Sequence, residues 1–166
     1  MKNKTDYSYE EIVHLCYSLF SDLKVSNFIP QKILVIPNGS LVISRIMIEL
    51  FNDYIERDSC IIKKWVVEPI FLGPDAMLKK DWRVLVLDEI CDSGKTLQEI
   101  YDAYKPSFER GNYKSAVLHL RKKGARNSAK RKITPNFFVE VLDHDEYINY
   151  PWEYKILEDI ICGCKI

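Results

Sequence analysis

The composition of the chain excludes several classes of protein before any motif is considered. The chain has 166 residues, 47% hydrophobic and 29% charged, which suits one globular domain with a real core. Basic and acidic residues both number 24, so no overall field favours nucleic acid. No apolar run approaches the length of a membrane span, and no hydrophobic segment after the polar first residues predicts a signal peptide.

The cysteines are odd in number and scattered, at positions 16, 60, 91, 162 and 164. We interpret them as reduced thiols and expect a cytoplasmic protein. Cys162 and Cys164, one residue apart, are candidates for a metal site or a redox pair. Because no second Cys/His cluster lies nearby in the sequence, we favour a packed chain end.

The first half of the chain predicts a helix followed by a βα unit. Ser8 and Glu11 have the spacing of a capping box, and apolar residues then recur at helical spacing up to residue 23. Residues 33–36 predict a buried strand, residues 37–40 a turn, and residues 41–51 a helix. The polar turn therefore follows the carboxyl end of a strand, where open α/β sheets place their ligands.

The next segment predicts a strand and a long connection. Residues 60–67 are apolar apart from two lysines and indicate a strand. Residues 68–82 contain Pro69, Gly73 and Pro74 and predict a connection long enough to be a flexible lid.

The most informative stretch runs from residue 84 to residue 96. Residues 84–87 predict a strand buried on both faces, and two carboxylates, Asp88 and Glu89, follow it. Residues 92–96, Asp-Ser-Gly-Lys-Thr, predict a tight turn into a helix. Glycine allows the backbone to approach a ligand closely, and amides at a helix start attract anions. The pattern predicts a phosphate on the loop and a polyol held by the carboxylates.

Residues 93–96 end like a P-loop, but that motif requires glycine five residues before Gly94, where this chain has Glu89. Residues 84–96 instead resemble the phosphoribosyl diphosphate (PRPP) signature of type I phosphoribosyltransferases at every position. The resemblance assigns Asp88 and Glu89 to the ribose hydroxyls, and to Mg²⁺ directly or through water. It assigns the 5′-phosphate to Ser93, Gly94, Lys95 and Thr96, and it counts Asp92 beside them among the PRPP-binding residues.

The same resemblance gives roles to two earlier segments. In this family the loop after the first strand holds pyrophosphate and usually has a basic residue before glycine. Here that position is Asn38, so the resemblance leaves the anion to the backbone amides of Asn38, Gly39 and Ser40. The family's mobile flap corresponds by position to residues 68–82, where Lys79 and Lys80 are alternative phosphate partners.

Two more strands are predicted at residues 115–120 and 137–141, separated by a basic stretch. Residues 121–132 include seven basic residues, which indicate a solvated loop or a nucleic-acid patch, although aromatic residues are not interleaved. A third interpretation comes from the resemblance. The family members that use 6-oxopurines place a lysine just after this strand, donating to the purine O6. Lys122 matches that position best, and Lys123 is the alternative register.

Residues 147–153, Tyr-Ile-Asn-Tyr-Pro-Trp-Glu, are similar to a segment near the C-terminus of microbial xanthine-guanine and archaeal hypoxanthine-guanine phosphoribosyltransferases. The resemblance implies that Tyr147 stacks on the purine and that Ile148 offers it a main-chain carbonyl. It also makes Glu153 a candidate metal ligand. The alternative is that these aromatic side chains pack in the core.

Together these features predict a mostly parallel, twisted α/β sheet flanked by helices. We expect one domain over residues 1–166, with a purine-binding hood from about residues 122–166. The resemblance implies a purine salvage enzyme that transfers phosphoribosyl from PRPP to guanine, xanthine or hypoxanthine, with Mg²⁺ as cofactor. It makes Asp92 the general base, or hydrogen-bond partner, at purine N7.

The alternative function is a non-catalytic regulator with the same fold, which senses PRPP or binds nucleic acid. Asn38 and the basic stretch favour it, whereas the intact Asp88, Glu89 and Asp92 favour the enzyme. We expect PRPP and a purine as partners, no membrane or nucleic acid, and a homodimer or higher homo-oligomer.

Overall fold

The computed structural model describes residues 4–36, 39–58, 68–71, 82–108, 112–122, 133–142 and 147–152. Within these ranges the chain alternates strands and helices. In chain order the elements are β1 (Lys4–Asp6), α1 (Tyr9–Val25), β2 (Lys32–Val35), α2 (Ser40–Asp58), β3 (Glu68–Phe71), β4 (Val84–Cys91), α3 (Lys95–Phe108), β5 (Tyr113–Arg121), β6 (Phe137–Leu142) and β7 (Tyr147–Asn149).

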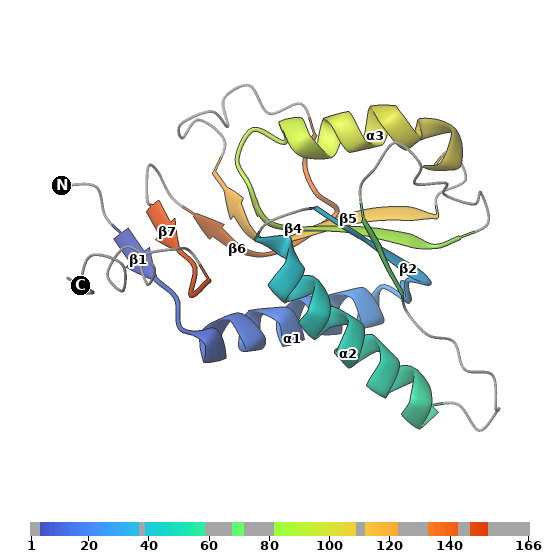
Figure 1. Ribbon diagram of the computed structural model, residues 1–166, viewed down its shortest axis with the longest axis horizontal. Coiled ribbons are helices and arrows are strands. Elements are labelled where there is room, and N and C mark those ends of the chain that lie inside the picture. Colours follow the sequence, from blue (N-terminus) through green and yellow to red (C-terminus); the bar gives the residue numbers. More distant parts are fainter. Residues whose placement is uncertain are drawn as a thin grey trace, which may run out of the picture.

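The main sheet has five strands in the order β3-β2-β4-β5-β6, and every pairing is parallel. Helices α1 and α2 cover one face of this sheet and α3 covers the other (Figure 1). This is the parallel α/β sheet that the sequence predicts. The strand order reverses between β2 and β4, because β3 follows on one side of this pair and β5 and β6 follow on the other. A crevice at such a switch point is where open α/β sheets bind ligands.

Two apolar cores hold the layers together because β4 is buried on both faces. Leu85 and Leu87 pack in the core shared with α1 and α2, while Val84 and Val86 pack toward α3. All four side chains are at most 2% exposed. The continuous apolar run in the sequence therefore serves both layers at once.

The N-terminal and C-terminal parts of the described chain form a second, two-stranded sheet. Strands β1 and β7 run parallel, with Thr5 opposite Ile148, and lie beside the β6 end of the main sheet (Figure 1). Ile148 and Tyr150 are buried and join the core of α1 and α2. From here on, the hood means the described segments 4–7 and 147–152, of which only the second lies within the predicted 122–166.

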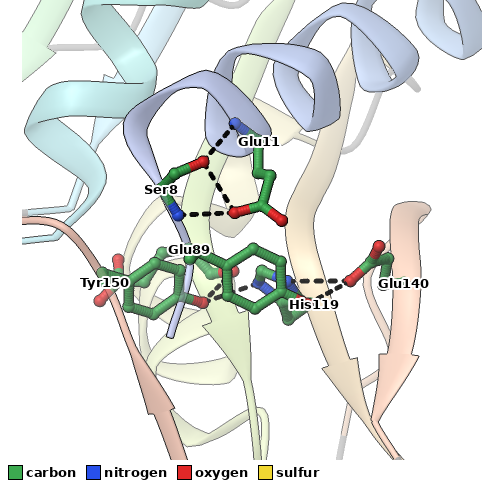
Figure 2. Close-up of polar contacts among 7 residues, drawn as sticks. Ser8, Glu11, Glu89, His119, Glu140 and Tyr150 are labelled. Carbon is green, nitrogen blue, oxygen red and sulfur yellow. Dashed lines mark hydrogen bonds and ion pairs between the residues drawn. The ribbon is translucent and has the colours of Figure 1, made fainter. Parts of the chain in front are cut away.

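Most predicted elements are present, with different limits. Helix α1 begins with the predicted capping box: Glu11 N–H donates to Ser8 Oγ, and Ser8 N–H donates to Glu11 (Figure 2). Strand β4 extends four residues beyond the predicted 84–87, so Asp88 and Glu89 lie inside it rather than after it. Helix α2 extends seven residues beyond the predicted end at residue 51.

The prediction of a connection throughout residues 68–82 is wrong at its start, because residues 68–71 form β3 and pair with β2. Pro69 can occupy this strand because β3 is at the edge of the sheet, where a missing N–H is tolerated. The predicted strand at 60–67 and the central part of the predicted lid lie outside the described residues. In the described part of the chain, no helix combines the length and the hydropathy needed to cross a bilayer.

Candidate functional site

A pocket of about 120 Å³ lies where β4 ends and α3 begins. The residues around it are consecutive or nearly so, because the strand, the loop and the first helical turn wrap around one space. They are Asp88, Ile90, Cys91, Asp92, Ser93, Gly94, Lys95, Thr96 and Leu97. Six of these were predicted as site residues, so the structure brings the predicted PRPP loop and one predicted carboxylate to a single cavity.

The floor of the pocket is shaped by a sharp backbone turn. Gly94 has φ of 70°, a left-handed conformation that a side chain makes costly, and it is buried. Helix α3 begins at the next residue, and its first backbone N–H groups have no partner within the helix. The Lys95 N–H lies 3.3 Å from Ser93 Oγ, which accepts from it. The pocket therefore combines a helix N-terminus with a Ser/Gly loop, an arrangement suited to a phosphate.

The two acidic residues of β4 interact with each other. Burial raises the pKa of Asp88 to about 9, and the hydrogen bond that protonated Asp88 donates to the Glu89 side chain and the negative charge of Glu89 add to the shift. The Glu89 N–H donates to Asp88 Oδ1 at 3.0 Å, and this bond lowers the pKa of Asp88, against the other effects. At neutral pH this pair of carboxyl groups holds a proton that a cation or a hydrogen-bond donor would displace.

Glu89 also links β4 to the loop before α2. Its carboxylate lies so close to Gly39 that a Cβ on Gly39 would overlap it. Gly39 is thus a position where only the absence of a side chain allows the contact. The loop that was predicted to bind pyrophosphate therefore meets the carboxylates at the same edge of the sheet. Gly39 and Glu89 therefore lie on the same side of the molecule. Asn38, the residue before Gly39, lies outside the described residues.

Ser40 lies at the first turn of α2 with its side chain turned inward. It is fully buried, and its hydroxyl donates to the carbonyl of Ile36. The side chain stabilises the turn between β2 and α2, which leaves only the backbone of this residue for the predicted anion contact.

Asp92, the predicted general base, is held by an arginine that the sequence analysis did not single out. Arg121 Nε donates to Asp92 Oδ1 at 2.5 Å, and the arginine side chain is only 2% exposed against 35% for Asp92. Arg121 is the last residue of β5, beside the end of β4. The sequence carries no signal for this contact, because the predicted strand ends at residue 120 and only the structure places Arg121 on β5.

The predicted purine-binding residues lie on the hood and at the end of β5. Lys122 is exposed, and its backbone N–H donates to the Leu142 carbonyl at 2.8 Å. Tyr147 is 45% exposed on β7, whereas Ile148 is buried, so only its main chain is available to a ligand. Asn38, Lys79, Lys80, Lys123 and Glu153 lie outside the described residues.

Comparison with solved structures identifies the fold. No protein-family model and no curated protein matches the chain. A xanthine-guanine-hypoxanthine phosphoribosyltransferase from Helicobacter pylori matches with a TM-score of 0.70 and 18% identity, over 96% of this chain and 99% of that one. A purine phosphoribosyltransferase from Pyrococcus horikoshii matches with a TM-score of 0.68 and 18% identity, over 90% and 94%.

A third structure, a hypothetical protein from Neisseria gonorrhoeae with bound ppGpp, matches with a TM-score of 0.66 and 17% identity, over 96% of this chain and 94% of that one. All three likenesses span nearly the whole of both chains. The chain therefore has the type I phosphoribosyltransferase fold that the PRPP-like signature predicts. At these identities the likeness defines the fold, and the activity rests on the site residues.

Proposed function

We propose that this protein is a purine phosphoribosyltransferase that joins a 6-oxopurine to PRPP and releases pyrophosphate. The observation that carries the proposal is the pocket in which Asp88, Asp92 and the 93–96 loop meet at the start of α3. In the reaction, the anomeric C–O bond to pyrophosphate breaks, a C–N bond to the purine forms, and the purine loses a ring proton. Pyrophosphate leaves with the electron pair of the broken bond.

The 5′-phosphate is assigned to the loop that ends at α3. The backbone N–H groups at the start of the helix, with the hydroxyls of Ser93 and Thr96, provide the donors that phosphate oxygens require. Gly94 allows the backbone to turn around the phosphate. A phosphate here fixes one end of the sugar, which brings its anomeric carbon toward Asp92.

The ribose hydroxyls are assigned to Asp88 and Glu89. Ribose hydroxyls donate to carboxylates, and the proton that this pair holds at neutral pH is lost when a better partner arrives. Hydroxyl contacts on the sugar resist rotation about the phosphate and orient the anomeric carbon.

The same carboxylates fit Mg²⁺. They provide hard oxygen donors, and a divalent cation would offset both the burial and the repulsion from Glu89 that raise the pKa of Asp88. Among the described residues no group of three metal-ligating side chains occurs, so the ion would keep waters and substrate oxygens as its other ligands. When bound, Mg²⁺ neutralises charge on the leaving pyrophosphate.

Asp92 is assigned to the purine N7 proton. Its carboxylate borders the pocket and is anchored by Arg121, which fixes its direction and keeps a cation behind it. An anchored carboxylate accepts a proton or a hydrogen bond from the base without rotating away. The base itself is assigned to the hood and the end of β5, with Lys122 donating to O6, Tyr147 stacking, and the Ile148 carbonyl accepting.

The alternative is a regulator that binds a phosphorylated ligand without catalysis. Two observations favour it: Asn38 stands where the resemblance implies a basic residue, and the Neisseria gonorrhoeae protein of this fold binds ppGpp. A guanosine phosphate would use the same phosphate loop and hood as a product nucleotide.

One assay separates the two functions. Purified protein is incubated with PRPP, Mg²⁺ and each of guanine, xanthine, hypoxanthine and adenine, and pyrophosphate release is measured. The enzyme releases pyrophosphate with at least one 6-oxopurine, and Asp92→Asn lowers the rate by at least about tenfold. A protein that binds PRPP or ppGpp in titration calorimetry but releases no pyrophosphate with any base is the regulator.

A further inference from the structure

A buried polar cluster lies next to the carboxylates of β4, outside the pocket. His119 on β5 is fully buried, and its ring lies between the side chains of Glu140 on β6 and Tyr150 in the hood (Figure 2). His119 Nδ1 is 2.8 Å from the Tyr150 hydroxyl, and Nε2 is 3.3 Å from Glu140 Oε2. None of these three side chains has a role in the reaction proposed above.

The cluster ends on the main chain of a site residue. The Tyr150 hydroxyl donates to the backbone carbonyl of Glu89 at 3.2 Å (Figure 2). The Glu89 side chain in turn lies against Gly39. Glu89 is therefore fixed from two directions, by the glycine on its side chain and by a tyrosine hydroxyl on its backbone.

The hydrogen bonds of the cluster run from His119 through Tyr150 to Glu89. The Tyr150 oxygen accepts from Nδ1–H of His119 and gives its own proton to the Glu89 carbonyl, so one hydroxyl serves both neighbours. At the other end, Tyr7 donates to Glu140 Oε2 at 2.5 Å. With its proton on Nδ1 and its pKa lowered by burial, His119 has no proton at Nε2, so Glu140 lies beside this nitrogen without a hydrogen bond and Tyr150 alone orients the ring.

The hood supplies both tyrosines, and both of their rings pack against His119. The His119 ring centroid is 4.8 Å from that of Tyr7 and 5.6 Å from that of Tyr150. Tyr150 stacks on Trp152 at 5.0 Å with an interplanar angle of 11°. Tyr7 N–H donates to the Asn149 carbonyl at 3.1 Å, which ties the end of β1 to β7. The hood is therefore linked to the Glu89 backbone through the Tyr150 hydroxyl.

We propose that Tyr150 is a positioning residue for Glu89, oriented by His119, and that it determines how tightly the site binds the ribose of PRPP. This inference rests on the proposed function, because the ribose contact of Glu89 is part of that proposal. It adds that the hood, besides covering the base, holds the sugar-binding carboxylate in place.

The test removes one hydroxyl. Tyr150→Phe keeps the ring, its stacking on Trp152 and its burial, and loses the hydroxyl that bonds Glu89 and His119. The matched control is Tyr54→Phe on α2, about 20 Å along the helix from Gly39. Titration calorimetry measures binding of PRPP with Mg²⁺, of ribose 5-phosphate and of inorganic phosphate to each protein.

The two phosphate ligands separate positioning from general damage. In the proposed site, ribose 5-phosphate contacts both the 93–96 loop and the carboxylates of Asp88 and Glu89, whereas inorganic phosphate contacts the loop alone. Loss of a buried hydrogen bond predicts binding of PRPP and ribose 5-phosphate about threefold to tenfold weaker in Tyr150→Phe. Inorganic phosphate binding stays unchanged, and Tyr54→Phe binds all three ligands like the wild type.

A second variant covers the case in which Tyr150→Phe does not fold. His119→Phe keeps an aromatic ring at this fully buried position and removes the Nδ1–H that orients the Tyr150 hydroxyl. It weakens ribose 5-phosphate binding in the same direction by about twofold or more. In the double variant the two effects are not additive, because both act through the same hydrogen-bonded chain.

Each outcome decides the inference. If the wild type binds ribose 5-phosphate and both variants bind it equally well, Tyr150 does not position Glu89, and the proposed function stands. If Tyr150→Phe weakens inorganic phosphate as much as ribose 5-phosphate, the tyrosine supports the fold only. If the wild type binds neither PRPP nor ribose 5-phosphate, the proposed function fails, and the positioning role fails with it.

Discussion

Arg121 Nε donates to Asp92 Oδ1 at 2.5 Å, from a side chain that is almost completely buried to one that is partly in solvent. The two partners therefore differ in what they lose when the pair is broken. A carboxylate at the pocket edge regains water, but a buried guanidinium does not. The end of β5 is thus constrained to place a cation behind Asp92.

The first prediction follows from this asymmetry. Asp92→Ala removes a partner from a buried cation and destabilises the protein by on the order of 3 kcal/mol. Arg121→Met replaces the cation with an apolar chain of similar volume and costs about 1 kcal/mol, although the rate of pyrophosphate release falls in both. Urea unfolding at pH 7 measures the difference. Equal stabilities of the two variants would contradict it.

The second prediction concerns Asp88 and pH. Because its pKa is raised to about 9 in the folded protein, Asp88 holds a proton there that it releases on unfolding. The stability it contributes is fully present below about pH 4, its unfolded pKa, and is lost as pH rises toward 9. Asp88→Asn carries no such proton. Its melting temperature relative to the wild type should rise by about 3 °C or more between pH 5 and pH 9.

The control for this prediction is Asp22→Asn, on the exposed side of α1. The melting temperature of this variant relative to the wild type should stay constant over the same pH range. If Asp88→Asn also shows no change between pH 5 and pH 9, the two carboxyl groups of β4 do not share a proton, and the electrostatic argument for a cation there is lost.

The sequence predicts the pocket well because its residues are local. A strand, two acids, a small-residue loop and a helix follow one another, and consecutive residues can make a phosphate site without help from distant parts of the chain. The capping box of α1 is predictable for the same reason. The signal in each case is a spacing of a few residues, which a single sequence displays directly.

The features that the sequence does not predict depend on distant contacts. Strand β1 has only three residues, Lys-Thr-Asp, with no apolar alternation, and is a strand because β7 pairs with it. His119 and Tyr150 are 31 residues apart, and nothing in either local pattern indicates that they touch. Arg121 resembles the first residue of a solvated basic run until β5 places it against Asp92. Pairing between distant segments decides all three.

The third prediction tests the contact between the two loops. In Gly39→Ala, the new methyl group would overlap the Glu89 carboxylate. The overlap involves the end of a flexible side chain, so Glu89 rotates away and the protein loses no more than about 1 kcal/mol of stability. PRPP binding weakens by about tenfold because the carboxylate leaves the ribose. Calorimetry and urea unfolding together measure both effects.

Ser44→Ala is the matched control for Gly39→Ala, because it lies one turn further along α2 and is buried. It should leave PRPP binding unchanged. If Gly39→Ala unfolds the protein, the glycine is needed for the backbone of the loop. If it binds PRPP normally, Glu89 is not a ribose ligand.

The last prediction is that the base is a 6-oxopurine read by Lys122. Guanine, hypoxanthine and xanthine carry a carbonyl at position 6 that accepts from an ammonium group, whereas adenine presents an amino donor there. A site built around a polar partner rejects the analogue that leaves it unpaired. Lys122→Ala should therefore lower kcat/KM for guanine about 10-fold to 100-fold, the loss expected for a charged hydrogen bond.

Tyr147 and the basic residues near Lys122 supply the controls for that assignment. Stacking is indifferent to the group at position 6, so Tyr147→Ala raises KM for every base and leaves the preference among them intact. If Lys122→Ala leaves the rate unchanged and Lys123→Ala lowers it, the lysine that contacts the purine O6 is Lys123. If instead Arg121→Lys alters the preference between guanine and adenine, the buried arginine reads the base. If adenine is the best substrate of the unmodified protein, the roles given to Lys122 and Asp92 are both wrong.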